Sequence, residues 1–185
     1  MSKADILRYM RTSSKTDNEQ ILALADKAIE IIKETAVPKT LCRVFDCEVG
    51  EDTVTIDGVT FNSKRLAQNM NGCNKAAVFG ATLGIAVDKR IKIASATDVA
   101  LAMALQAAAA DKIEEVCDNL EETIKAQYGV TLRQRYSPGY FDLDITEQKK
   151  FFSLLQLEKR IGLTLTETCE MVPTKSVTAF IGMEG

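Results

Sequence analysis

The sequence contains no histidine and no tryptophan, and its 185 residues include only three prolines. Without histidine, the chain cannot build the Ser-His or Cys-His pairs that activate a nucleophile, nor an imidazole base. The five cysteines are an odd number and form no CxxC pair, so neither a disulfide framework nor a zinc site is supported. We therefore expect no metal site, and any chemistry must use carboxylates, phenols, guanidiniums, backbone groups or a borrowed cofactor.

The sequence also lacks long apolar runs and an excess of basic charge. The N-terminal residues have no apolar core of signal-peptide length, and no stretch approaches the roughly 18 apolar residues of a membrane span. The 23 basic and 26 acidic side chains give a net charge of −3, which provides no uniform basic surface for nucleic acid. These absences predict a cytoplasmic protein that binds neither membranes nor nucleic acid.

What the chain does have is 46% apolar residues over a length suited to one well-buried domain. We expect a single domain at 1–185, with an N-terminal helical segment at 1–35 and a sheet-and-helix core at 36–185. Helical spacing of apolar residues predicts helices at 18–34, 63–70, 97–128 and 146–161, and the ambiguous stretch 85–95 favours a helix. The helix at 97–128 begins at cap residues and ends at Gly129.

Several runs of β-branched and aromatic residues predict strands. The runs before and after Asp57-Gly58 indicate a hairpin, and residues 75–84 have the composition of a buried strand. A strand is expected to lead from residue 130 into the Pro138-Gly139 turn, and the tail contains two β-rich runs divided by Pro173. Because hairpins and helices are segregated, we expect an α+β fold: an antiparallel sheet with flanking helices, one long helix crossing it.

The stretch RQRYSPGY at 133–140 concentrates two guanidiniums, two phenols and a Pro-Gly turn. A planar guanidinium such as that of Arg135 can hold a carboxylate or phosphate through two parallel hydrogen bonds. Glycine lets backbone N–H groups approach a ligand closely, and a tyrosine on each side offers a flat surface suited to adenine or a macrocycle. The simpler interpretation is a strand end with a surface arginine and ordinary turn residues.

Acidic residues on the helix at 97–128 form a second candidate feature. Asp111, Glu115, Asp118 and Glu122 follow one stripe, with Glu114 and Glu121 alongside. Such a stripe is usually a solvated face. A carboxylate of this helix and Arg135 could nevertheless converge on one zwitterion, the acid holding an ammonium and the arginine a carboxylate.

Two other residues are better explained as structural. Cys73 has no histidine partner and precedes an apolar strand, so it is expected to be a small buried thiol. Glu167 lies between two threonines in the tail and remains a weak site candidate.

From residue 135 onwards the chain contains, in this order, Arg-x-x-Pro-Gly-Tyr at 135–140, a helix, Gly-x-x-Leu-Thr-Glu-Thr, Met-x-Pro and Ser-Val-Thr. This order resembles the S-adenosylmethionine-binding activation domain of cobalamin-dependent methionine synthase. The upstream runs GCNKAAVFGATLG and AAAADKIEEVCDNLEE resemble stand-alone versions of that domain, so the similarity extends over almost the whole chain. The resemblance implies the activation-domain version of the α+β fold described above.

The resemblance also implies a set of cofactor-binding positions. Arg135 matches the arginine that holds the methionyl carboxylate, and Glu115 matches a helix acid near the ammonium. Residues 137–139 match a loop whose backbone contacts adenosine. Tyr140 matches a tyrosine that faces the sulfonium and the corrin, and it is therefore the catalytic candidate. The implied positions are Glu115, Arg135, Ser137, Pro138, Gly139 and Tyr140.

In function, the resemblance implies an S-adenosylmethionine-binding protein that supports reductive methylation, and so reactivation, of cobalamin in a separate methionine synthase or related corrinoid methyltransferase. The implied partners are that cobalamin-binding protein and a flavodoxin-type electron donor. If the chain is part of an enzyme, the activity would be methionine synthase methyltransferase activity, with methyl passing from S-adenosylmethionine to Co(I) of the partner.

Two alternatives are kept beside this interpretation. Ile181-Gly182 stands where the family has an aromatic pair, and only Asp5 is available to match an N-terminal aspartate of the family. Both departures favour a protein that has lost ligand binding and serves only in docking to, or assembly with, a corrinoid protein. An ordinary S-adenosylmethionine methyltransferase is disfavoured, because no glycine-rich loop follows an early strand with an acidic residue downstream.

Overall fold

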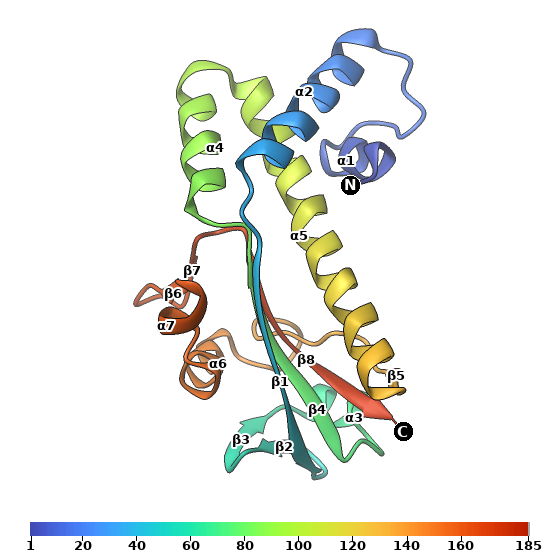
Figure 1. The fold of residues 1–185 in the computed structure, drawn as a ribbon, viewed down its shortest axis with the longest axis vertical. Helices are drawn as coiled ribbons and strands as arrows, with labels where there is room; N and C mark the ends of the chain where they lie inside the picture. Colours follow the sequence, from blue (N-terminus) through green and yellow to red (C-terminus); the bar gives the residue numbers. More distant parts are fainter. Residues whose placement is uncertain (185) are drawn as a thin grey trace.

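The computed structural model describes residues 1–184 of the 185-residue chain. Its centre is a six-stranded sheet in the order β3-β2-β1-β4-β8-β5, in which every neighbouring pair is antiparallel (Figure 1). The strands of this sheet are β1 Lys39–Val49, β2 Thr53–Ile56, β3 Val59–Asn62, β4 Lys75–Thr82, β5 Thr131–Leu132 and β8 Ser176–Glu184. A separate small hairpin pairs β6 Thr164–Leu165 with β7 Met171–Val172. The predicted α+β class is confirmed.

The helices cover both faces of this sheet, and α5 runs along its length (Figure 1). Their bounds are α1 Lys3–Tyr9, α2 Glu19–Thr35, α3 Lys64–Asn69, α4 Ile85–Thr97, α5 Val99–Tyr128, a 3-10 turn η1 Ile145–Glu147, α6 Gln148–Leu155 and α7 Leu157–Ile161. The side chains of Asn18 and Asp98 accept backbone N–H bonds at the starts of α2 and α5. Gly129 ends α5 in the left-handed conformation, as expected. No helix within residues 1–184 is long and apolar enough to cross a membrane.

The structure differs from the sequence-based expectation at three places near the C-terminus. The expected strand after Gly129 is reduced to the two residues of β5, and the first of the two β-rich tail runs folds into the β6–β7 hairpin. The expected helix at 146–161 is divided at Gln156, which has a φ of 54°. The break allows Leu157 to lie over the sheet at Gly80, where an added Cβ would come within 2.7 Å of its side chain.

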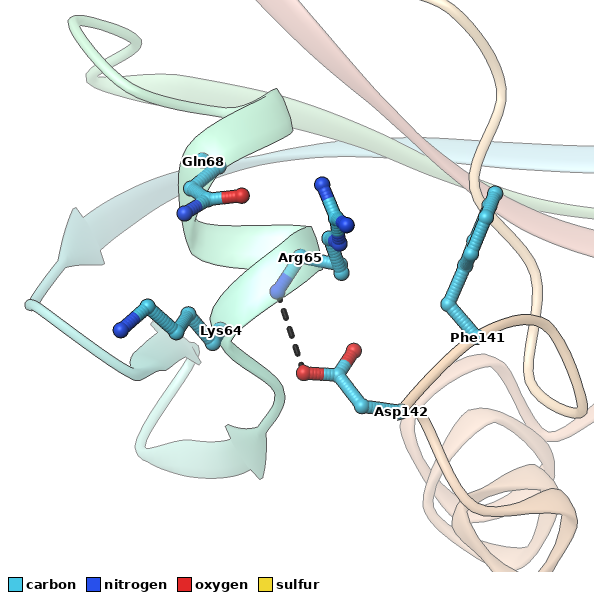
Figure 2. Close-up of a pocket in the computed structure, with 5 residues that line it drawn as sticks. All are labelled: Lys64, Arg65, Gln68, Phe141 and Asp142. Atoms are coloured by element: carbon cyan, nitrogen blue, oxygen red, sulfur yellow. Dashed lines mark hydrogen bonds between the residues drawn. The ribbon is translucent and has the colours of Figure 1, made fainter.

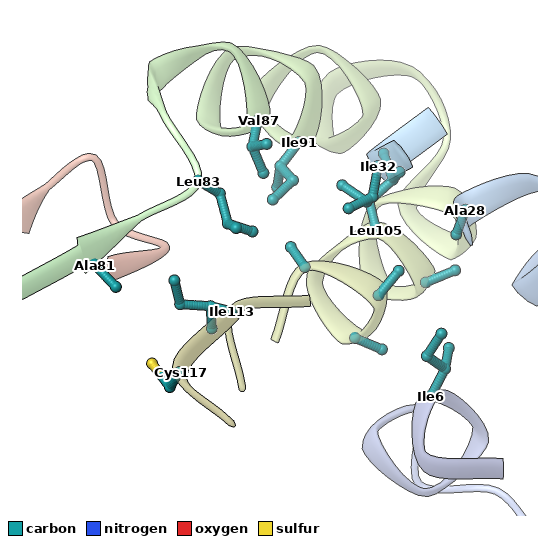
Figure 3. Close-up of a cluster of buried hydrophobic side chains, with 14 of the residues drawn as sticks. Ile6, Ala28, Ile32, Ala81, Leu83, Val87, Ile91, Leu105, Ile113 and Cys117 are labelled. Atoms are coloured by element: carbon teal, nitrogen blue, oxygen red, sulfur yellow. The ribbon is translucent and has the colours of Figure 1, made fainter. Parts of the chain in front are cut away.

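Two apolar clusters lie on opposite faces of the sheet. The first joins β4 and β8 to α1, α2, α4 and α5 (Figure 3). Small alanines on the first half of α5, such as Ala104 and Ala108, are fully buried and let neighbouring helices approach closely. On the other face, Phe61, Phe151 and Phe180 pack together with ring centres 4.3–5.7 Å apart. The two clusters fix β8 between α5 and the segment that contains α6.

Candidate functional site

A cavity of about 910 Å3 lies where α5, the segment at 134–141, α3, α6 and the start of β8 meet. This volume is within the range of small-molecule sites. Its lining residues are Arg65, Gln68, Asn69, Glu114, Glu121, Gln134, Arg135, Tyr136, Ser137, Pro138, Tyr140, Phe141, Ile145, Gln148, Met171, Ser176, Val177 and Thr178. We call it the main cavity. It combines charged groups at one wall with aromatic and apolar groups at others.

The segment at 133–141 is attached to the sheet by backbone bonds and then turns away. The N–H of Arg133 donates to the carbonyl of Gly182, and Tyr136 and Phe180 exchange two backbone hydrogen bonds of 2.9 and 3.0 Å. Beyond them the chain bends at Pro138-Gly139. Gly139 has a φ of 89°, and an added Cβ would lie 3.0 Å from the Ile145 side chain, so only glycine fits this turn without strain.

Arg135 is held by three carboxylates of α5. Its Nη1 donates to Asp118 and Glu121 at 2.8 Å each, and its Nη2 donates to Glu114 at 2.9 Å. Burial alone would lower the pKa of this guanidinium, but its hydrogen bond to Asp118 and the charges of the other two acids raise the pKa above its usual value. The side chain is 21% exposed, so these ion pairs are partly shielded from water.

The acids of α5 are divided between two faces of the helix. Glu114, Asp118 and Glu121 are spaced i, i+4 and i+7 and face Arg135. Glu115 is turned by about 100° from Glu114. It contacts the amine of Met1 and accepts a hydrogen bond of 3.1 Å from Lys112.

The expected meeting of Glu115 with Arg135 is therefore not observed. The ammonium beside Glu115 is the chain's own N-terminal amine, and the hydrogen bond with that amine is the main cause of the lowered pKa of Glu115. The reason for the difference is helix phase, since residues one position apart cannot face the same partner. Among the described residues, the acids that line the main cavity are Glu114 and Glu121.

The structure brings most of the other expected positions together. Arg135, Ser137, Pro138 and Tyr140 line the main cavity, whereas Gly139 shapes the turn without being part of the lining. Tyr140 is 64% exposed at the rim. Whether these residues bind the ligand in the way that the resemblance implies remains a prediction.

A smaller cavity of about 440 Å3 adjoins the main one, with Arg65, Gln68 and Phe141 common to both (Figure 2). The guanidinium of Arg65 lies 6.0 Å from the ring centre of Phe141, which is 83% exposed. Asp142 fastens the rim to the start of α3, because its carboxylate accepts hydrogen bonds from the Ser63 hydroxyl at 2.5 Å and the Arg65 N–H at 3.2 Å. The Ser63 bond is the main cause of the lowered pKa of Asp142.

Several lining residues were not singled out from the sequence. Asn69 on α3 and Gln148 on α6 are more than twenty residues apart along the chain. Each belongs to an element whose local pattern indicates only a helix or a strand. No local signal could have assigned them to one site, because only the packing of these elements places them together.

The remaining sequence candidates lie outside the main cavity. Cys73 is buried and unpaired, as expected of a structural thiol, and Glu167 and Asp5 are not part of the lining. Ile181 is buried in the α5-facing core, and Gly182 packs against Cys73. Neither Ile181 nor Gly182 is part of the lining of this cavity.

Comparisons with known proteins match this chain to one family model and to solved structures. The family model described as vitamin B12 dependent methionine synthase, activation domain, matches residues 66–184, which is more than half of the chain. The crystal structure of the MetH reactivation domain bound to AdoHcy is similar to this chain, with a TM-score of 0.67 and 19% sequence identity. At this identity the similarity shows a shared fold. The match covers 90% of this chain and 65% of that one. Among curated proteins, no sequence matches this chain.

Proposed function

This chain belongs to the family of vitamin B12-dependent methionine synthase activation domains, and from that membership we propose that its main cavity binds S-adenosylmethionine. The bound methyl donor would serve the reductive methylation, and so the reactivation, of cobalamin carried by a separate methionine synthase or related corrinoid methyltransferase. Supporting observations are the family match, the shared fold with a domain that was crystallised with AdoHcy, and the cavity itself.

The observation that carries this proposal is the distribution of charge at the α5 wall. Arg135 lies there against Glu114 and Glu121, which both line the cavity, and against Asp118, which does not. S-adenosylmethionine carries an ammonium, a sulfonium and a carboxylate, so it is a net cation. Glu114 or Glu121 can accept from the ammonium, and Arg135 can hold the carboxylate through N–H groups that the acids do not use. The α5 wall of the cavity therefore offers carboxylate acceptors for the ligand's ammonium beside a guanidinium donor for its carboxylate.

The chemistry asks little of the protein beyond binding and orientation. A partner's corrinoid, reduced by one electron from a flavodoxin-type donor, would supply the nucleophile, and this chain would hold S-adenosylmethionine and then the S-adenosylhomocysteine that methyl transfer leaves. The sulfonium already carries its leaving group, so a site without histidine is sufficient. Tyr140 and Phe141, both exposed at the rim, are the residues of this chain that we propose face the partner's macrocycle.

Calorimetric titration with S-adenosylmethionine tests the proposal directly. We expect the wild-type chain to bind and Arg135→Ala to weaken binding by about 1.5–3 kcal/mol, which is at least about tenfold in Kd. Removal of Arg135 also leaves three acids without their cation, so Arg135→Lys, which keeps the charge but not the forked geometry, should be measured beside it. Absence of binding to the wild-type chain would overturn the proposed function, whereas equal affinities would overturn only the role of Arg135.

A docking or assembly role without ligand is the second candidate. The observation that favours it is that three carboxylates already engage Arg135, the residue expected to hold the ligand's carboxylate. Thermal unfolding separates the two roles, since a ligand at 100 times its Kd adds about 2.7 kcal/mol of stability. A chain that binds a corrinoid protein but shows no thermal shift with S-adenosylmethionine would support the docking role.

A further inference from the structure

The outer edge of β1 has no neighbouring strand over most of its length. β4 pairs with β1 from Lys39 to Asp46, whereas β2 pairs with it on the other side only from Cys47 to Val49 (Figure 1). No other strand of residues 1–184 pairs with β1. The side of residues 39–46 that lies away from β4 is therefore an open strand edge, which we call the β1 edge.

The register of the sheet determines which backbone groups face outward at the β1 edge. The N–H of Cys47 donates to the carbonyl of Asn74, just before β4, and alternate residues of an antiparallel strand direct their N–H and C=O to the same side. Odd-numbered residues of β1 therefore bond towards β4, whereas Thr40, Cys42 and Val44 direct their N–H and C=O outward. These outward groups make no hydrogen bond to any residue in 1–184.

The β1 edge has few of the features that usually protect a strand edge. The stretch 39–46 contains neither proline nor glycine, and its pairing with β4 continues without a bulge. Arg43 is folded over the face of the sheet that carries α6 and α7, where its guanidinium lies 4.7 Å from the Phe45 ring centre and donates to the Leu154 carbonyl at 3.4 Å. An unpaired edge of this length is a template for one more strand.

We propose that the β1 edge pairs with the β1 edge of a second copy of this chain, in antiparallel register about a two-fold axis at Cys42. In this register Cys42 faces Cys42 of the second copy, and Thr40 faces Val44 in both directions. Each of these pairs can exchange two backbone hydrogen bonds, so the two sheets become one continuous antiparallel sheet. The half-buried side chains of Cys42 and Val44, on the face that packs against α5, would then be covered further.

The charges of β1 suit an antiparallel partner of the same sequence. The stretch 39–46 begins with the cation Lys39 and ends with the anion Asp46. Antiparallel pairing brings the Lys39 end of one copy beside the Asp46 end of the other, whereas parallel pairing would bring like charges together. The Asp46 side chain is 92% exposed, and its ion pair with Lys75 is long at 3.9 Å, so it is free to meet a second cation.

The position of the axis is limited by Arg43 and by β2. An axis at Arg43 would place the Arg43 side chains of the two copies directly opposite each other, which is unfavourable. An axis at Val44 would place Thr40 opposite Glu48, where β2 already pairs with β1. The axis at Cys42 avoids both conflicts and keeps most of the open edge in the pairing.

Sedimentation equilibrium over a wide range of chain concentrations tests the pairing. We expect the wild-type chain to form a dimer, and Cys42→Glu and Cys42→Lys each to raise the dimer Kd at least about fivefold, because each change places two like charges opposite each other. An equimolar mixture of the two variants should dimerise again, since a carboxylate then faces an ammonium. Cys42→Ser keeps the size of the side chain and adds no charge, so it is the matched control and should remain dimeric.

A proline at Val44 tests the backbone bonds separately. Val44→Pro removes an N–H that points away from β4, so the pairing with β4 loses no bond, whereas the dimer loses one bond at each of two symmetric positions. We expect the dimer Kd to rise at least about tenfold. Val44→Ala keeps the N–H and should remain dimeric.

Three results would overturn this inference. A wild-type chain that stays monomeric at every soluble concentration would leave the β1 edge to water or to an extended segment of another protein. A dimer that the charged Cys42 variants do not weaken must form through another surface. Charged variants that stay monomeric when mixed would show that the loss is not caused by like charges at the axis. If Val44→Pro does not fold, the two charged variants decide alone, and because none of these measurements involves S-adenosylmethionine, their failure leaves the proposed function unaffected.

Discussion

The two neighbouring acids of α5 provide a matched pair of variants, Glu114→Gln and Glu115→Gln. Both changes remove one charge from the same turn of the same helix. Glu114 lines the main cavity and bonds Arg135, whereas Glu115 bonds Lys112 and the Met1 amine on another face. If the cavity binds the methyl donor, only Glu114→Gln should change its affinity.

The expected magnitudes follow from exposure and charge. A hydrogen bond to a charged group contributes about 1.5–3 kcal/mol, but the Glu114 side chain is 48% exposed, so water reduces its contribution to about 1 kcal/mol. We therefore expect Glu114→Gln to weaken S-adenosylmethionine binding about fivefold. Glu115→Gln should leave Kd unchanged within a factor of about two. It should lower stability by about 0.5–1 kcal/mol, since its side chain is 35% exposed and loses an ion pair.

Calorimetric titration gives the two affinities, and urea unfolding at pH 7 gives the two stabilities. A fivefold loss of affinity in Glu115→Gln with none in Glu114→Gln would refute the structural assignment and favour the residue that the resemblance implies. Equal losses in both variants would indicate a long-range effect of charge. That effect is identified by repeating the titrations at high salt, where it should disappear.

Three further outcomes concern stability. Hydrogen bonds from Ser63 and Arg65 lower the pKa of Asp142, so its contribution is present above about pH 4 and is lost as pH falls through that lowered pKa. Because this carboxylate is exposed, Asp142→Asn should cost less than about 1 kcal/mol in urea unfolding at pH 7, and the difference from the wild-type chain should shrink as the pH is lowered below about 4. Gly182→Ala should lower the free energy of unfolding by about 1–3 kcal/mol, because the new Cβ would lie 2.8 Å from Cys73 Sγ. Adding Cys73→Ala should recover part of that loss, and simple additivity of the two changes would contradict this contact. We propose that residues 1–35 and 36–185 unfold as one domain. Ile6→Ala, at a fully buried position of α1, should then lower the free energy of unfolding by about 2–4 kcal/mol while calorimetry still shows a single transition. Two separate transitions would contradict this proposal.

The sequence alone identified the elements whose signals are local. The end of α5 at Gly129 and the turn at Asp57-Gly58 are found where they were expected, because a helix end or a tight turn depends on residues only a few positions apart. The sequence also identified the family and the Arg135–Tyr140 segment through its resemblance to the motifs of that family. It overestimated the strand after Gly129, since the length of a strand depends on the partner that pairs with it.

Only the tertiary structure decided which acid faces Arg135 and what closes the rest of the cavity. The acids of α5 look alike in sequence, and their partners are set by the rotation of that helix against the segment at 133–141. The contributions of Gln148 and Thr178 depend on how α6 packs against β8, which is set by the burial of the whole aromatic cluster on that face of the sheet. Local residue patterns determine the elements, whereas burial summed over the chain determines how those elements are placed around one cavity.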